Sequence, residues 1–139
     1  MKVVLDTDVI VAALRSPSGA SAELLRRARR EQITLAASVS LFMEYEAVCT
    51  RPEHVAASGR SARQVDLFLD GLASIVKSVE VHFLWRPQLR DPADELVLEA
   101  AVNASARALL TFNQKHFGGV ANRFQIEVVT PGEFLRSLP

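Results

Sequence analysis

Cysteine is almost absent from this 139-residue chain, since Cys49 is the only one. A single cysteine excludes an intramolecular disulfide framework and a zinc site built from several cysteines, and it fits a reducing compartment. Long apolar runs are also missing, because no stretch approaches the roughly 20 apolar residues of a membrane-spanning helix. The first residues, Met1-Lys2-Val3-Val4, lack the basic and apolar regions of a signal peptide. We therefore expect a cytoplasmic domain that contacts no membrane.

An excess of charge of either sign is missing too. The chain has 16 Lys and Arg residues against 16 Asp and Glu residues, and its pI is about 6.8. A globally basic nucleic-acid-binding surface is therefore excluded, although a local basic patch is not. Hydrophobic residues make up 49% and charged residues 23%, which is ordinary for a globular protein and excludes a disordered chain. The length predicts a single domain over residues 1–139.

Three common nucleotide and hydrolase motifs do not occur. The sequence contains no G-x-x-x-x-G-K-[ST], no G-x-G-x-x-G and no G-x-S-x-G. P-loop nucleotide hydrolysis, dinucleotide binding and α/β-hydrolase chemistry therefore have no support.

Short apolar runs alternate with helical patterns along the chain. The predicted strands are Val3 to Leu5, Ile33 to Ala37, Val79 to Phe83 (near a sheet edge), Ala108 to Phe112 and Ile126 to Val129. The predicted helices are Val9 to Leu14, Ala22 to Glu31 after an N-cap at Ser21, Leu41 to Cys49 after Ser38 or Ser40, a helix from Ser61 that includes Val65 to Val76, Ala93 or Asp94 to Ser105, and Glu133 to Leu138. This alternation predicts a three-layer α/β/α sandwich around a mostly parallel sheet of about five strands.

Polar side chains follow several of these strands. Asp6 ends the first strand, Glu44 lies one turn into the helix after the second, and Asp94 begins the helix after the third. Thr111 and Asn113 lie at the end of the fourth. Because the carboxyl ends of parallel strands meet at one edge of a sheet, these groups are expected to converge. Crowded carboxylates favour a hard divalent cation such as Mg²⁺.

Each acid also has a simpler interpretation. Asp6 and Asp94 are good helix-capping residues, and Glu44 is equally compatible with a solvated helix face. Asp8, Asp91, Glu95, Glu46 and Glu99 are expected to be solvated or capping. Only the convergence of Asp6, Glu44 and Asp94 favours the metal site.

The ordered set of motifs resembles the PIN-domain family over essentially the whole chain. The motifs are Val4-Leu5-Asp6-Thr7-Asp8-Val9, Ser40-x-x-x-Glu44, Asp91-Pro92-Ala93-Asp94-Glu95, Leu110-Thr111-Phe112-Asn113-Gln114-Lys115-His116-Phe117 and Val129-Thr130-Pro131-Gly132-Glu133-Phe134-Leu135. The last is similar to the end of the toxin components (VapC-like ribonucleases) of toxin–antitoxin pairs. Two positions depart from the family pattern: Asn113 stands where many members have a fourth acid, and Asp8 stands where Asn is commoner.

The resemblance implies a metal-dependent endoribonuclease that hydrolyses RNA and leaves a 5′-phosphate and a 3′-hydroxyl. Asp6, Glu44, Asp94 and Asn113 are then the catalytic set, and Asp6, Asp94 and Glu44 hold Mg²⁺ or Mn²⁺. Thr7, Thr111 and Ser40 form the supporting polar shell. The resemblance also implies a homodimer and a small antitoxin protein that blocks the acidic site, for which an arginine is the natural plug.

Several alternatives stay open at this level. A PIN-fold RNA-binding protein with weak or lost catalysis is the main rival, with Asn113 as its hint. A flavodoxin-like receiver module is the second rival, but this chain lacks the paired acids before the end of the first strand and the lysine after the last strand that such a module would have. His116 is expected to be a loop residue, and Trp85 to pack rather than stack on a base. The arginines of residues 26–30 form either a solvated face or a phosphate-guiding one, and the apolar helix Val65 to Val76 either packs in the core or forms a contact surface.

Overall fold

The computed structural model describes residues 1–82 and 88–139. Within them, five parallel strands form one sheet in the order β3-β2-β1-β4-β5. The strands are β1 (Lys2–Leu5), β2 (Thr34–Ala37), β3 (Val76–Ser78), β4 (Ala108–Leu110) and β5 (Glu127–Val129). The predicted α/β fold with a parallel sheet of about five strands is confirmed.

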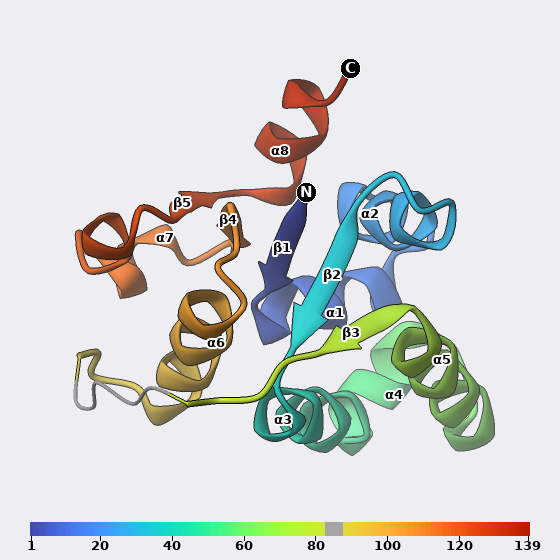
Figure 1. Ribbon diagram of the computed structural model, residues 1–139. Helices are drawn as coiled ribbons and strands as arrows, with labels where there is room; N and C mark the ends of the chain where they lie inside the picture. The colour runs from blue at the N-terminus through green and yellow to red at the C-terminus, as the bar shows by residue number, and fades with distance from the viewer. Residues whose placement is uncertain (83–87) are drawn as a thin grey trace.

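Helices cover both faces of this sheet (Figure 1). They are α1 (Thr7–Arg15), α2 (Ala20–Arg29), α3 (Val39–Cys49), α4 (Pro52–Ser58), α5 (Ala62–Ile75), α6 (Pro92–Asn103), α7 (Gln114–Phe117) and α8 (Pro131–Ser137), with a short 3-10 helix at Ala121–Phe124. Helix α6 packs against β1, β2 and β4, and α3 lies beside it. Helix α2 packs against α1 and α8.

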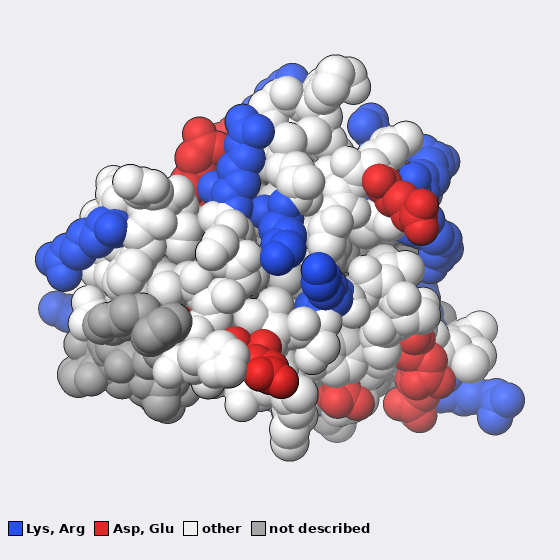
Figure 2. Space-filling model, in the orientation of Figure 1, with Lys and Arg blue, Asp and Glu red and all other residues white. Residues whose placement is uncertain are grey.

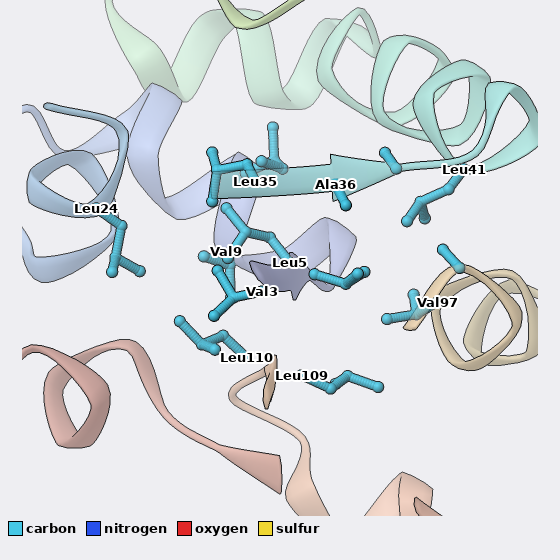
Figure 3. Packing of buried hydrophobic residues seen from close by; sticks show 14 of the residues in the cluster. Val3, Leu5, Val9, Leu24, Leu35, Ala36, Leu41, Val97, Leu109 and Leu110 are labelled. Atoms are coloured by element: carbon cyan, nitrogen blue, oxygen red, sulfur yellow. The ribbon is translucent and has the colours of Figure 1, made fainter. Parts of the chain in front are cut away.

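The core lies where the central strand meets both helical layers. Val3 and Val4 of β1 are fully buried, as expected for a bare apolar strand that is covered on both faces. Figure 3 shows Leu24 of α2 on one side of the strands and Val97 of α6 on the other. This apolar packing holds the carboxyl ends of β1 and β4 side by side, since Leu5 pairs with Leu110.

The helix starts follow ordinary capping chemistry. The Ser38 hydroxyl accepts a hydrogen bond from the Leu41 amide, so Ser38 rather than Ser40 caps α3. Ser61 and Thr130 each form a capping box, with Gln64 and Glu133 respectively. The predicted cap at Ser21 is wrong: Gly19 is the cap of α2, and Ser21 is buried inside the helix.

The third strand is the clearest error of sequence reasoning. The alternation over Val79 to Phe83 predicted a strand there, but β3 is Val76–Ser78 and Val79 follows it. The register explains the shift, because Leu35 of β2 pairs with Val76, directly after α5 ends. The edge position of this strand is confirmed. Phe83 and Trp85 lie outside the described residues, so the predictions for them have no structural counterpart.

Two short helices were not predicted. Pro52 occupies the first turn of α4, where proline is well tolerated, so the chain continues as a helix after α3 instead of a loop. Helix α7, which is four residues long, comes after β4. In the apolar helix α5, Val65, Leu69 and Leu72 are buried, whereas Leu67 is exposed. No helix of the described residues is long and apolar enough to cross a membrane.

Candidate active site at the carboxyl ends of β1 and β4

Asp6 lies between β1 and α1 and is 7% exposed. Its backbone amide donates to the Leu110 carbonyl at 2.9 Å, which continues the pairing of β1 with β4. Its carboxylate caps α1 by accepting from the Thr7 amide at 2.7 Å, and it also accepts from the Thr111 hydroxyl at 2.6 Å. The predicted capping role is therefore real, but the same carboxylate is also held in a polar cluster across two strands.

Thr111 is the central hydrogen-bonding residue of this cluster. It is fully buried directly after β4, and its hydroxyl oxygen also accepts from the Asn113 amide at 2.9 Å. Because one hydroxyl both donates to Asp6 and accepts from the following loop, it fixes the position of both. Thr111 therefore links Asp6 to the loop after β4.

Asp8 and Asn113 form a side-chain pair across the same edge. The Asn113 Nδ2 donates to Asp8 Oδ2 at 2.9 Å, and the Phe112 amide donates to the same oxygen at 3.0 Å. Asp8 was expected to be solvated or capping, but it is half-buried and binds the loop after β4. The two residues that depart from the family pattern are thus direct partners.

Asp94 lies in the first turn of α6 and is 7% exposed. Asp91, rather than Asp94, is the N-cap of α6, and its carboxylate accepts from the Ala93 amide at 2.9 Å. Asp94 Oδ2 lies 3.2 Å from His116 Nδ1 of α7. His116 was expected to be a loop residue; the structure instead places it in a helix, against one of the candidate catalytic acids.

The acids of the cluster act on one another electrostatically. Burial, above all, raises the pKa of Asp6 and of Asp94, and the Asp6 charge raises the pKa of Asp94 further. Burial and the nearby Asp6 charge raise the pKa of Asp8 to about 6. His116 lowers the pKa of both Asp6 and Asp94, which places it within electrostatic reach of the two acids. Such crowding of buried carboxylates is typical of functional sites.

The structure does not join every predicted residue to the cluster. Glu44 is half-buried on α3, and no hydrogen bond or ion pair among residues 1–82 and 88–139 links it to Asp6 or Asp94. Ser40 is exposed one turn earlier on the same helix. Thr7 contributes its backbone amide to Asp6, while its hydroxyl oxygen is buried without a hydrogen-bond partner in the described part of the chain.

Sequence reasoning undervalued Asp8, His116 and Glu95. His116 lies in α7, which begins directly after Asn113, and its contact with Asp94 of α6 is one that no local pattern indicates. Glu95 was expected to be solvated or capping. It is buried, and its carboxylate accepts from the amides of Gln88 and Leu89, which no local pattern indicates.

The sequence matches the PIN domain family over residues 2–115, which is most of the chain. The chain belongs to the PIN domain family. No curated protein matches it. Among solved structures, its fold is similar to the crystal structure of VapBC2 from Rickettsia felis bound to a DNA fragment from their promoter, with a TM-score of 0.59 and 20% sequence identity. That match covers 92% of this chain and 97% of the other.

PIN domains typically use a divalent metal ion, and the acids of this PIN domain suit one. Asp6 and Asp94 offer carboxylate oxygens, which hard cations prefer, although the His116 Nδ1 lies beside Asp94. One carboxylate oxygen of Asp8 is buried without a hydrogen-bond partner in the described residues. Those residues contain no group of three or more His, Cys, Asp and Glu side chains arranged to hold a metal ion. Mg²⁺ nevertheless needs only one or two protein carboxylates, because it keeps several waters.

Proposed function

We propose that this PIN domain is a metal-dependent endoribonuclease and the toxin of a toxin–antitoxin pair. The observation that supports this most strongly is the pair of buried acids, Asp6 and Asp94, which come from elements almost ninety residues apart; burial raises the pKa of both, and the Asp6 charge raises the pKa of Asp94 further. A fold alone does not require two buried carboxylates at one edge. PIN domains are generally nucleases, so the family supports the same reaction class.

In this proposal, Asp6 and Asp94 hold Mg²⁺ or Mn²⁺, with Glu44 and Asn113 completing the catalytic set. The metal ion would supply an activated water and neutralise charge on the phosphodiester in the transition state. The chain's own residues keep the acids in place: Thr111 and the Thr7 amide orient the Asp6 carboxylate, and His116 holds Asp94 at the start of α6.

The partners follow from the same proposal. The R. felis structure that this chain resembles is a VapBC complex, and we propose a small antitoxin for this chain too, with an arginine that reaches the acids. We also propose a homodimer, and action in the cytoplasm, where its RNA substrate is present.

The test is RNA cleavage with a matched pair of variants. Purified protein is incubated with a labelled single-stranded RNA and Mn²⁺ or Mg²⁺, and with EDTA as the metal-free control. We expect cleavage only with the metal, and its loss in Asp94→Asn. Asp66→Asn, which removes an exposed aspartate of α5, should cleave like the wild type. Full activity of Asp94→Asn would refute the site.

A PIN-fold RNA-binding protein with little catalysis is the second candidate. One observation favours it: the side chain at the fourth acidic position is the neutral Asn113, and its amide is already engaged by Asp8. Binding of RNA without cleavage under either metal would support this second function instead.

A further inference from the structure

Tyr45 is the only tyrosine of the chain and one of its largest fully buried side chains. It lies on α3, one residue after Glu44 and one turn before the buried Cys49. Helix α3 packs against α1 and α6, the two helices that begin at the candidate active site. The Phe42 ring meets the Tyr45 ring edge-on, with the two centroids 5.8 Å apart. The ring of Tyr45 therefore belongs to the core, where its hydroxyl needs a hydrogen-bond partner.

The partner of this hydroxyl is the backbone next to Asp6. The Tyr45 hydroxyl donates to the Leu5 carbonyl oxygen at 2.5 Å, a contact between residues 40 positions apart. That carbonyl belongs to the peptide group whose amide is that of Asp6, and the Asp6 amide donates to the Leu110 carbonyl at 2.9 Å. Because a peptide group is planar, the bond from α3 and the bond to β4 together fix its orientation.

The sheet does not supply the bond to the Leu5 carbonyl. The last residue of β1 that pairs with β2 is Val3, opposite Leu35. In a trans peptide the carbonyl and the amide point in opposite directions, so the Leu5 carbonyl faces away from β4, toward the side of β2. A buried carbonyl without a partner costs free energy, and Tyr45 satisfies this one at the point where the pairing of β1 with β2 has ended.

We propose that Tyr45 is a positioning residue for the metal site: its hydroxyl orients the Leu5–Asp6 peptide and so holds the Asp6 carboxylate where a divalent cation can bind. This inference rests on the proposed function, because it concerns the metal ion of that proposal. The same bond ties α3 to the end of β1. Since Glu44 precedes Tyr45 on α3, the bond also sets where the helix that carries Glu44 lies relative to Asp6.

The Tyr45 hydroxyl suits this role because it stays protonated. Burial, above all, raises the pKa of Tyr45 well above its ordinary value, and the Asp6 charge raises it further. The hydroxyl is therefore a hydrogen-bond donor at neutral pH. A neutral donor orients Asp6 without pairing with its charge, so the carboxylate keeps the charge that a cation requires.

Tyr45→Phe tests the proposal, because it removes the hydroxyl and keeps the ring. Its matched control is Cys49→Ala, which truncates another buried side chain of α3 and leaves the Tyr45 hydroxyl in place. Thermal unfolding first defines a temperature at which both variants are folded. Calorimetry then measures the affinity for Mn²⁺, and NMR measures hydrogen exchange of the Asp6 amide in metal-free protein, with the Val4 amide of the same strand as the internal reference.

We expect Tyr45→Phe to bind Mn²⁺ about tenfold more weakly than the wild type, at the lower end of the effect of losing a group that orients a metal ligand. Its Asp6 amide should lose protection relative to the Val4 amide, because the loss is local to the end of β1. Cys49→Ala should bind Mn²⁺ like the wild type, and any loss of protection should affect the Asp6 and Val4 amides alike.

The single tyrosine allows a second measurement that does not need Tyr45→Phe to fold. 3-Fluorotyrosine supplied during expression labels Tyr45 alone and keeps its hydroxyl. We expect Mg²⁺ to shift the ¹⁹F signal in a saturable way, and Asp6→Asn to abolish this shift. A ¹⁹F signal that does not respond while calorimetry shows metal binding would overturn the link between Tyr45 and the metal site.

The outcomes separate this inference from the proposed function. If the wild type binds Mn²⁺ and Tyr45→Phe binds it equally well, the positioning role is wrong and the metal-dependent function stands. If the wild type binds no metal ion but Tyr45→Phe loses protection at Asp6 alone, the metal-dependent function is wrong and Tyr45 still positions Asp6. Equal losses of protection at Asp6 and Val4 would show that the hydroxyl only supports global stability, and would overturn the inference.

Discussion

Asp8 offers the sharpest test of the electrostatics at this site. Its carboxylate is half-buried between α1 and the loop after β4, next to the Asp6 charge, and its pKa is raised from 3.8 to about 6. At neutral pH, the folded protein therefore holds a charge that the unfolded chain would solvate better. Asp8→Asn removes this charge and can keep the hydrogen bonds from Phe112 and Asn113, because its amide oxygen still accepts.

The size of the stability change follows from the linkage between proton binding at Asp8 and folding. Between pH 3.8 and about 6, the folded state binds more protons at Asp8 than the unfolded state does, so stability falls as pH rises through this range. A shift of this size corresponds to about 3 kcal/mol for a fully buried group. Because Asp8 is only half-buried, solvent screening reduces the figure to about 1 kcal/mol. Asp8→Asn should therefore be more stable than the wild type above pH 6, and equally stable below pH 4.

The assay is thermal unfolding in EDTA at pH 4 and pH 7.5. We expect Asp8→Asn to unfold about 3 °C higher than the wild type at pH 7.5 and at the same temperature at pH 4. Asp66→Asn on the exposed face of α5 should match the wild type at both pH values. A loss of stability in Asp8→Asn that is equal at both pH values would show that hydrogen bonding, rather than charge, dominates at Asp8, and would refute the reasoning.

Three further predictions concern neighbouring groups. Asn113→Asp should bind Mn²⁺ more tightly in calorimetry. It should also lower the free energy of unfolding of the metal-free protein by about 1 kcal/mol, because it places a carboxylate against Asp8 where the wild type has a donor. Adding Asp8→Asn should recover that stability, and a double-mutant cycle without coupling would contradict the pairing. Thr111→Val should cost about 1–3 kcal/mol in denaturant unfolding, because the buried hydroxyl serves both Asp6 and the Asn113 amide; an unchanged midpoint would rule this out. Reversing Arg29 and Arg30 to Glu should leave RNA affinity nearly unchanged, because α2 lies across the sheet from α6 (Figure 1); a flatter salt dependence of binding would instead assign α2 to phosphate guidance.

The surface charge agrees with a local rather than a global nucleic-acid site. Figure 2 shows Lys and Arg side chains scattered over one face of the molecule, with Asp and Glu side chains between them. On α2, Arg26 is engaged by Glu23 at 3.1 Å and by the Pro17 carbonyl at 3.0 Å. These contacts engage Arg26, whereas Arg29 and Arg30 are exposed; whether the α2 arginines form a solvated or a phosphate-guiding face stays a prediction.

The sequence by itself predicted the mostly parallel sheet of about five strands and six of the helices that cover it. Runs such as Val3 to Leu5 and Ala108 to Leu110 are apolar on both faces, which only a covered strand tolerates. Ser61 and Thr130 cap their helices through hydrogen bonds within the first turn, so these helix starts depend on local sequence alone. Asp6 and Asp94 could be assigned to one edge because parallel strands bring their carboxyl ends together.

Only the tertiary structure decided which side chains meet at that edge. Asp8 and Asn113 are 105 residues apart and bond because β1 and β4 are neighbours, a fact that no local pattern contains. The position of β3 depended on its register with β2, which overrode the alternation over Val79 to Phe83. The contact of His116 with Asp94 required a helix after β4, anchored by the buried Phe117. Local sequence sets backbone preferences, but contacts between distant residues depend on how the sheet and its helices pack.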